Sequence, residues 1–109
     1  MRRGDIHIAA VRGAYTGKPR PVVIVQDDRF DATASVTVCP LTTDLVEAPL
    51  TRLAIEPTVS TGIEQQSHIM VDKITTMARA KVREYIGRLA DEDLIRLDRA
   101  LIVFLGLAG

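Results

Sequence analysis

Residues 21–25 read Pro-Val-Val-Ile-Val, and this β-branched run is the strongest structural signal in the chain. Valine and isoleucine have stiff side chains that pack well on a pleated surface, so a short unbroken run of them is typical of a buried strand. Upstream, Asp5–Val11 indicates a second strand that begins after Gly4. Residues 12–20 lie between the two and are rich in turn formers and basic side chains, which predicts a loop.

Three more strands are predicted downstream of this pair. Ser35–Cys39 alternates valine with polar side chains, and Pro40 ends the strand or places it at a sheet edge. Leu50–Glu56 shows a similar alternation and is stopped by a proline. Ser67–Thr75 forms the last strand after a turn at Gly62.

The last part of the chain changes to a helical period. Asp91 is expected to cap the N-terminus of a helix, where its side chain can accept from free backbone N–H groups, and Gly106 is placed to end it. One helical face collects large apolar side chains, namely Leu94, Leu97, Leu101, Phe104 and Leu105. Further apolar residues lie off this face and are buried either by a partner subunit or by close packing in a small barrel: Ile95, Ile102 and Val103.

Length, composition and element order together define the fold class. The chain has 109 residues, of which 47% are hydrophobic and 26% charged. These values predict one domain, residues 1–109, and exclude a disordered or collagen-like chain. Short strands followed by one amphipathic helix predict a mainly β fold, a small and strongly bent antiparallel sheet or barrel with a C-terminal helix.

The net charge is zero, but the charges are unevenly distributed. Residues 1–20 carry five basic side chains and one acidic one, and residues 21–72 carry two basic and eight acidic ones. Residues 73–83 carry four basic side chains and no acid. If the two basic segments lie on one face, a neutral chain still presents a local positive field to phosphates. Two separate solvated faces are the alternative.

The cysteine, the apolar segments and the histidines indicate the cellular compartment and whether a metal or cofactor is bound. The single cysteine, Cys39, has no internal disulfide partner and lies among apolar residues, which predicts a core position. The N-terminus lacks the apolar run of a secretory signal, and residues 100–109 are about half as long as a membrane span, so we expect a cytoplasmic protein without membrane contact. His7 and His68 are far apart, and no zinc-site spacing, phosphate loop or nucleophile elbow is present, so we expect no metal or cofactor.

Several short motifs occur in order along nearly the whole chain. They are Arg3-Gly4-Asp5-Ile6, residues 20–25 (Arg-Pro-Val-Val-Ile-Val), residues 38–42 (Val-Cys-Pro-Leu-Thr), Ser67 with residues 71–75 (Val-Asp-Lys-Ile-Thr), residues 86–89 (Ile-Gly-Arg-Leu) and residues 105–107 (Leu-Gly-Leu). Together they resemble the MazF/PemK toxin family. The resemblance implies a small SH3-like barrel of the CcdB/PemK type closed by a terminal helix, and a homodimer. It also implies metal-independent, sequence-selective cleavage of single-stranded RNA, and neutralisation by a cognate antitoxin.

The resemblance also implies which residues form the site. In the family, the arginine that opens the Arg-Pro-Val strand and the threonine that ends the Pro-Leu-Thr strand are catalytic, and they correspond to Arg20 and Thr42 here. A guanidinium has five donors that match phosphate oxygens, and a hydroxyl adds one more. RNA-binding residues are expected in the basic loop and along the groove: Arg12, Tyr15, Thr16, Lys18, Ser67, Asp72 and Lys73.

The motifs do not identify the group that accepts the proton of the 2′-hydroxyl. Many relatives carry a carboxylate in the loop before the arginine, whereas this chain reads Ala-Tyr-Thr-Gly-Lys at residues 14–18. A guanidinium is a reluctant base, so the acceptor is Arg20 itself or another group, namely His7, His68 or Asp72. The loop tyrosine either stacks on an unpaired base or packs on its own domain.

Two other functions are compatible with the same fold. One is a toxin that poisons DNA gyrase without nuclease activity, and the other is a barrel that binds RNA or protein without cleaving it. Arg20 and Thr42 favour the nuclease, whereas the missing loop carboxylate favours binding alone. If the chain is a metal-free nuclease, the 2′-hydroxyl attacks its own phosphate, and the predicted products are a 2′,3′-cyclic phosphate and a 5′-hydroxyl end.

Overall fold

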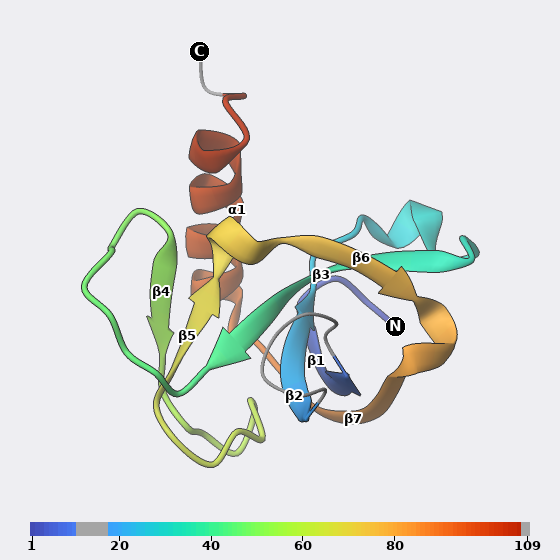
Figure 1. Cartoon of the computed structure of the whole chain (residues 1–109), viewed down its shortest axis with the longest axis horizontal. Coiled ribbons are helices and arrows are strands. Elements are labelled where there is room, and N and C mark those ends of the chain that lie inside the picture. Colours follow the sequence, from blue (N-terminus) through green and yellow to red (C-terminus); the bar gives the residue numbers. More distant parts are fainter. Residues whose placement is uncertain (11–17, 108–109) are drawn as a thin grey trace.

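The computed structural model describes residues 1–10 and 18–107, in which seven strands are followed by one helix (Figure 1). The strands are β1 (Asp5–Ala10), β2 (Pro19–Ile24), β3 (Ser35–Thr42), β4 (Arg52–Ile55), β5 (Ser67–Met70), β6 (Thr75–Ala78) and β7 (Val82–Arg88), and the helix is α1 (Asp91–Phe104). Short 3-10 turns lie at Asp28–Phe30 (η2), Val71–Lys73 (η3) and Arg79–Lys81 (η4). No helix in these two described ranges is long and apolar enough to cross a membrane.

All strand pairs are antiparallel, and β3 is the strand around which the sheet bends. The order along the sheet is β4-β5-β3-β2-β1-β7, and β6 also pairs with β3. β3 therefore pairs with β6 along its first half and with β5 at its end. The path ends at β4 and at β7 without closing. The predicted fold class, a strongly bent antiparallel sheet with one C-terminal helix, is confirmed (Figure 1).

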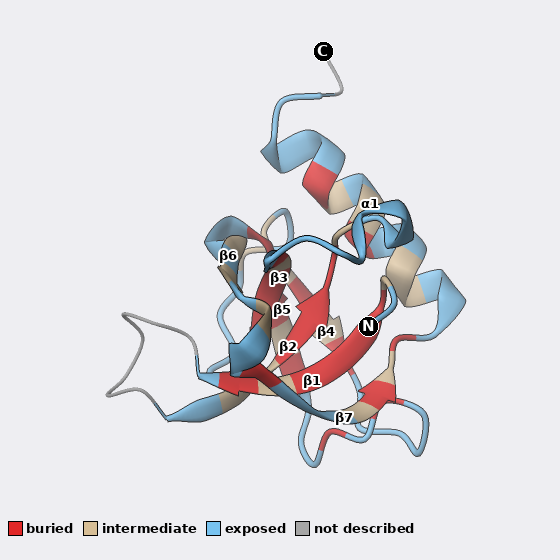
Figure 2. Ribbon diagram, turned by 90° about the vertical axis from the view of Figure 1, so that its right-hand side faces the viewer, coloured by how far each residue is buried: buried red, intermediate tan, exposed pale blue. Residues whose placement is uncertain are grey.

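Apolar side chains cover both faces of the central strands, which explains the unbroken Val-Val-Ile-Val run. Successive side chains of a strand point to opposite faces, so Val22 and Val23 are buried on different sides. Val23 belongs to a larger core cluster that includes Leu97 and Leu101 of α1. Val22 belongs to a smaller cluster with Val38 and with side chains of β6 and β7. Figure 2 shows the resulting buried segments of β1, β2 and β3 at the centre of the molecule.

Pro40 does not end its strand. The predicted end at Cys39 is wrong, because β3 continues to Thr42. β6 pairs with β3 as far as Val38, and β5 begins to pair at Leu41, so Pro40 lies between these two partners. A proline lacks the N–H that a ladder needs, and Pro40 occupies the gap between β6 and β5 on one side of β3 while it lies opposite Val22 of β2 on the other. The alternative of a sheet edge is wrong too, because β3 is an interior strand. The continuation carries the end of β3 to a position beside β5.

The predicted strand Ser67–Thr75 is also corrected, because a 3-10 turn interrupts it. β5 ends at Met70, the turn follows, and β6 starts at Thr75. Val71 in the turn is fully buried in the larger core, so the chain changes direction around an anchored side chain. The sequence does not predict β7, because two register shifts against β1 interrupt its alternation.

The face of α1 that packs on the sheet is the predicted one at Leu94, Leu97 and Leu101. Phe104 and Leu105, predicted on the same face, are exposed because the helix extends beyond the sheet there. Leu97 and Leu101 are buried in the larger core. The last turn extends beyond the sheet (Figure 1), and it leaves much of the apolar surface of the helix uncovered. The exposed residues are Ile95, Ile102, Val103, Phe104, Leu105 and Leu107.

The N-terminus of α1 differs from the prediction, and its C-terminus does not. Asp91 is the first helical residue rather than the cap, which is Ala90 and makes no side-chain capping bond. The reason is the preceding Leu89, whose side chain is buried and whose N–H donates to the carbonyl of Gly4 at 3.0 Å. The helix then begins two residues after this anchor, with Ala90 at the cap position. Gly106, with a φ of 74°, ends the helix as predicted.

Cys39 is fully buried in the larger core, as predicted. Burial raises the pKa of its thiol from 9.0 to about 12, because a thiolate loses its hydration in an apolar site. We expect the native chain to resist alkylation by iodoacetamide at mildly alkaline pH and the denatured chain to react fully, as measured by mass spectrometry. The neutral thiol favours the folded state below pH 9.0, and this contribution is lost as the pH rises toward 12. Rapid labelling of the native chain would contradict the buried position.

Candidate active site

The strand register brings Arg20 and Thr42 to the same face of neighbouring strands. β2 and β3 pair Val22 with Pro40. Arg20 lies two residues before Val22, and Thr42 lies two residues after Pro40, so both occupy the next position on that face. Both catalytic candidates are therefore placed at the same end of two adjacent strands.

A third side chain continues this row onto β5. Thr42 is directly opposite His68, and His68 is directly opposite Ala54 on β4. Directly opposed residues of an antiparallel pair have Cβ atoms about 4.5–5.5 Å apart, so their side chains are within reach of each other. The row, defined here as Arg20, Thr42 and His68, presents a guanidinium, a hydroxyl and an imidazole in that order.

Thr42 is held in place by the turn that follows β3. The residue is 6% exposed, and its Oγ1 accepts a hydrogen bond from the backbone N–H of Asp44 at 3.0 Å. A hydroxyl has one donor and two acceptor lone pairs. The contact with Asp44 uses one lone pair, so the O–H of Thr42 can still donate to a ligand oxygen.

Arg20 occupies a rigid and half-buried backbone position at the start of β2. Pro19 precedes it and Pro21 follows it, and each proline ring restricts φ. Its partner on β1 is Ala9, whose small side chain leaves room on this face. A guanidinium carries its charge at every physiological pH, so this position supplies a fixed cation beside Thr42.

Arg52 and Asp72 form a two-point ion pair near the row. Arg52 lies two residues before Ala54 on β4 and therefore shares its face. Its Nε and Nη2 donate to the two carboxylate oxygens of Asp72 at 2.9 and 3.2 Å. These bonds are the main reason that the pKa of Asp72 lies below its ordinary value of 3.8. The carboxylate is thus ionised and already bound, which makes it a poor proton acceptor.

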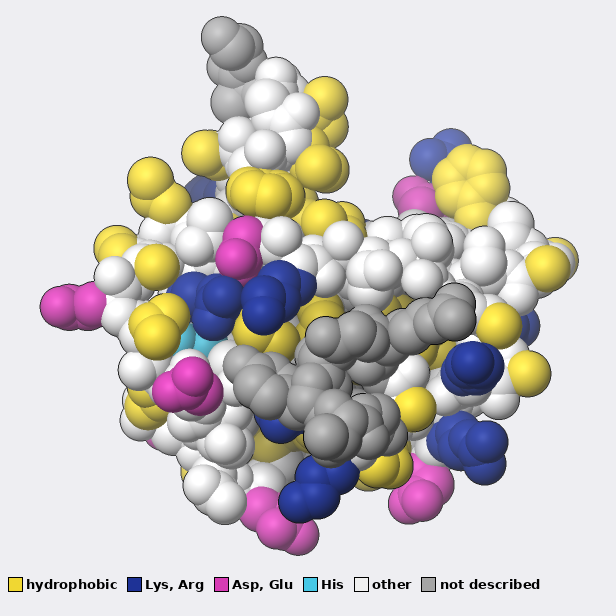
Figure 3. Space-filling view, in the orientation of Figure 1, with side chains coloured by type: hydrophobic (Ala, Val, Ile, Leu, Met, Phe, Trp, Pro, Cys, Tyr) yellow, Lys and Arg dark blue, Asp and Glu magenta, His cyan; other side chains and the backbone are white. Residues whose placement is uncertain are grey.

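Basic side chains surround part of this face. Lys18, before β2, and Lys73, in η3, are both exposed. Figure 3 shows Lys and Arg side chains gathered over β5 and the start of β6, with a second group near the lower end of β2. Other members of the two basic segments are engaged elsewhere, since Arg3 pairs with α1 and Arg79 donates to the turn before β3. Some basic side chains of the two segments are therefore available near the candidate site, and others make structural contacts elsewhere.

The structure does not bring every predicted RNA-binding residue into the row. Arg12, Tyr15 and Thr16 lie outside the described residues. Ser67 is only 4% exposed and lies on the opposite face of β5 from His68, because the two are neighbours in one strand. Its Oγ donates to the carbonyl of Gln65 at 3.0 Å.

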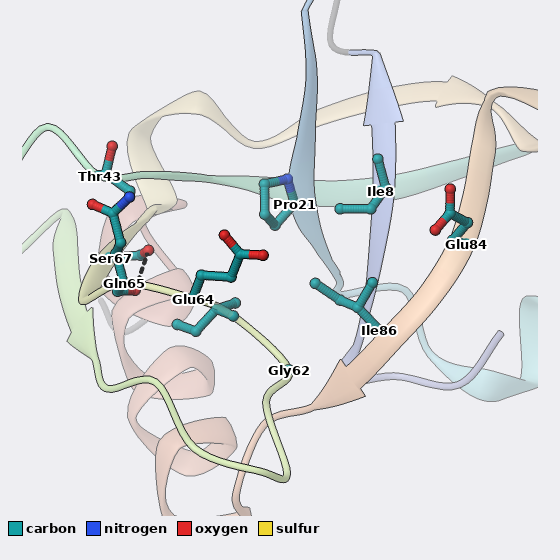
Figure 4. Close-up of a pocket in the computed structure, with 10 residues that line it drawn as sticks. Ile8, Pro21, Thr43, Gly62, Glu64, Gln65, Ser67, Glu84 and Ile86 are labelled. Carbon is teal, nitrogen blue, oxygen red and sulfur yellow. Dashed lines mark hydrogen bonds between the residues drawn. The ribbon is translucent and has the colours of Figure 1, made fainter.

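Ser67 instead lines a cavity of about 400 Å³ that the sequence does not predict (Figure 4). Ile8 and Pro21 are directly opposed on β1 and β2, and both line the cavity on the face away from the row. Glu64 and Glu84 lie on different sides of it in Figure 4. Two carboxylates give the cavity an acidic character, which disfavours a phosphate there. They come from a loop and from β7, so no local sequence motif joins them.

His7 occupies a structural position in β1. It is 7% exposed, its Nδ1 donates to the carbonyl of Arg83 at 2.9 Å, and its ring meets Tyr85 edge-on with 5.6 Å between the centroids. Across the described ranges, no three side chains of His, Cys, Asp or Glu come together in a group that could hold a metal ion.

Comparisons with known proteins point to one family. The family model for the PemK-like, MazF-like toxins of type II toxin–antitoxin systems matches residues 2–105. A protein of Mycolicibacterium smegmatis described as a probable endoribonuclease MazF is 63% identical over 109 residues, which cover the whole of both chains.

Solved structures agree with this match. The Mycobacterium tuberculosis toxin MazF-mt6 has a TM-score of 0.80 at 26% identity, and the match covers 94% of this chain and 96% of that one. An endoribonuclease from a mycobacterial species, in complex with its cognate antitoxin, has a TM-score of 0.75 at 23% identity, with 97% and 93% covered. On the match to the family model and the identity with the M. smegmatis protein, the chain belongs to the PemK-like, MazF-like toxins of type II toxin–antitoxin systems.

Proposed function

We propose that this toxin is an endoribonuclease that cleaves single-stranded RNA at selected sequences without a metal ion. The observation that carries the proposal is the register of β2 and β3, which puts Arg20 and Thr42 on one face at the same end of adjacent strands. Basic side chains beside them suit a polyanionic substrate. The relative that is 63% identical over the whole chain is described as a probable endoribonuclease, which supports the same activity here.

In the proposed reaction, the RNA supplies its own nucleophile. The 2′-hydroxyl attacks the neighbouring phosphorus and the bond to the 5′ oxygen breaks, which yields a 2′,3′-cyclic phosphate and a 5′-hydroxyl. Negative charge grows on the phosphoryl oxygens in the transition state. Arg20 meets this charge with a planar fork of donors, and Thr42 adds one O–H donor. Donors that are already oriented by the fold stabilise such charge without the reorganisation that water requires.

The proposal includes two protein partners. A second copy of the chain would remove the exposed apolar surface of α1, which includes Ile102, Val103 and Phe104, from water and form a homodimer. The related mycobacterial endoribonuclease was solved with its cognate antitoxin, and we propose that a cognate antitoxin likewise neutralises this chain by covering the basic face. We also propose a cytoplasmic location, since both the RNA substrate and the antitoxin are expected there.

Incubation of the purified chain with a long single-stranded transcript in EDTA tests this function. We expect discrete fragments whose 5′ ends are phosphorylated by polynucleotide kinase without prior phosphatase treatment, because they carry a hydroxyl. Thr42→Ala is expected to slow cleavage about 100-fold, and Thr42→Ser, which keeps the donor, to retain most of it. Dependence on added metal or 5′-phosphate ends would contradict the proposed chemistry. Intact RNA with trapped gyrase–DNA complexes would favour gyrase poisoning, and RNA binding without products would favour a non-cleaving protein.

A further inference from the structure

Building on the proposed RNA cleavage, we propose that His68 is the general base that accepts the proton of the attacking 2′-hydroxyl. The reaction needs a proton acceptor beside the donors that bind the phosphate. Arg20 is a reluctant acceptor because a guanidinium holds its proton strongly, and the hydroxyl of Thr42 is a weak base. His68 lies directly opposite Thr42 in the β3–β5 pair, at the next position of the row.

The structure argues against the other acceptors that the sequence left open. Asp72 is held by two donors of Arg52 at 2.9 and 3.2 Å, so both its oxygens are engaged. His7 of β1 pairs with Val22, outside the row, and its ring is fixed by the Nδ1 bond to the carbonyl of Arg83 and by the edge-on contact with Tyr85, although its Nε2 is also buried without a partner among the described residues. Of these three, within the described residues, only His68 combines a partly exposed imidazole with a place in the row.

Within the part of the chain that the structure describes, Nδ1 of His68 lacks a structural hydrogen bond. This nitrogen is buried, while the residue as a whole is half-buried. Buried polar atoms of native proteins are nearly always paired, so an unpaired one calls for an explanation, and a catalytic role is one of the recognised explanations. With Nδ1 turned inward, Nε2 is the nitrogen that remains for a substrate.

The charged and titratable groups near His68 decide whether another side chain could make the cleavage rate depend on pH. Thr42 and Ala54, directly opposite on β3 and β4, carry no charge. On the strands paired with β5 and the turns beside them, the charged side chains are Asp44 after β3, Arg52 of β4 with its partner Asp72, and Lys73 of η3. Arg20 lies one strand further along the sheet on β2, and Arg96 of α1 reaches the carbonyl of Ala54. Arginine, lysine and aspartate side chains do not ordinarily titrate near neutral pH, whereas the imidazole of a histidine does.

Nε2 of the neutral imidazole takes the proton of the 2′-hydroxyl while the 2′ oxygen forms its bond to phosphorus. The bond between phosphorus and the 5′ oxygen breaks, and the leaving oxygen takes a proton from water. The imidazolium then returns its proton to solvent, so no oxidant, reductant or further reactant is consumed.

The test compares the wild-type chain with His68→Gln on an oligonucleotide that carries one ribonucleotide, at the cleavage position mapped with the transcript. Single-turnover rate constants are measured from about pH 5 to about pH 9, across the range in which imidazoles titrate. We expect the wild-type rate to rise with pH and then level off, and the His68→Gln rate to be flat and about 100-fold lower at the plateau. Thermal unfolding of both chains establishes that the variant is folded. A folded variant that keeps the rate and the rising limb would overturn the proposal.

Two controls separate a general base from other roles. A substrate with sulfur in place of the bridging 5′ oxygen needs no protonation of its leaving group, so the deficit of His68→Gln is expected to persist on it. Restoration of the rate on that substrate would overturn the assignment as the base. Asp44→Asn removes a nearby carboxylate but keeps the backbone N–H that binds Thr42, so the rate of this variant is expected to rise with pH as in the wild type. Loss of this rise in Asp44→Asn would overturn the proposal. RNA left intact by the wild-type chain would contradict the proposed function itself, whereas cleavage that is indifferent to His68 contradicts this inference alone.

Discussion

Arg20→Ala is expected to lower the single-turnover rate of RNA cleavage about 1,000-fold while the chain stays folded. Removal of one oriented donor at a developing oxyanion costs about 100-fold to 1,000-fold in rate. This substitution removes a full positive charge and a two-point donor geometry together, which places it at the upper end of that range. The measurement uses the single-ribonucleotide substrate with enzyme in excess, so that product release does not limit the rate.

Two variants show whether the geometry or the charge of Arg20 matters. Arg20→Lys keeps the charge but loses the planar fork, so we expect a rate between those of the wild type and Arg20→Ala. Arg29→Ala removes the same charge from an exposed arginine of η2 that pairs with Asp27, the residue before η2, and we expect this variant to cleave as the wild type does. A loss of less than about tenfold for Arg20→Ala would rule out its role at the phosphate, since it falls far below the cost of one oriented donor.

Gly87→Ala is expected to destabilise the fold by about 3 kcal/mol and to lower Tm by roughly 10 °C or more. A Cβ at Gly87 would lie 2.2 Å from the carbonyl oxygen of Thr61 and 2.4 Å from that of Ser60. Both obstacles are backbone atoms, which cannot rotate away as a side chain does. The adjacent N–H of Arg88 donates to the same Ser60 oxygen at 2.7 Å, so moving the loop also breaks this bond.

Gly106→Ala is the matched control for Gly87→Ala. Gly106 has a φ of +74°, but a Cβ there meets nothing within 4 Å. The cost is therefore limited to the left-handed backbone, about 1 kcal/mol, and we expect a fall in Tm of roughly 5 °C. Thermal unfolding followed by circular dichroism compares the two. Equal falls in Tm would mean that the contact between β7 and the loop at Ser60 is not as close as described.

The elements that could be predicted from the sequence are those with a strong local period. Residues 21–25 form most of a doubly buried strand, and the leucine spacing after residue 91 marks α1, because burial on a regular element repeats at a fixed interval. Pro40 and β7 were missed for non-local reasons. Whether a proline is tolerated in a strand depends on which neighbour faces its nitrogen, and the alternation of β7 is interrupted by register shifts against β1.

Some residues of the candidate site could be predicted from sequence motifs, and others are identified only by the structure. Arg20 and Thr42 were identified by motifs that resemble a family, and their catalytic role stays a prediction until the variants are measured. Of the proton acceptors that the sequence leaves open, the structure favours His68, because β5 pairs with β3 at Thr42, and it places Ser67 on the other face of the same strand. The cavity with its two glutamates has no counterpart in any motif, since its walls come from separate elements.

The fold class, the buried position of Cys39 and the resemblance to a toxin family could all be predicted from the amino-acid sequence. Each of these depends on local periodicity, composition or ordered motifs. The tertiary structure alone decided which side chains share a face, because a strand has a period of two and a shift of one residue in register exchanges its two faces. The pairing of Thr42 with His68, on which the proposed proton transfer depends, follows from that register and from no feature of either segment on its own.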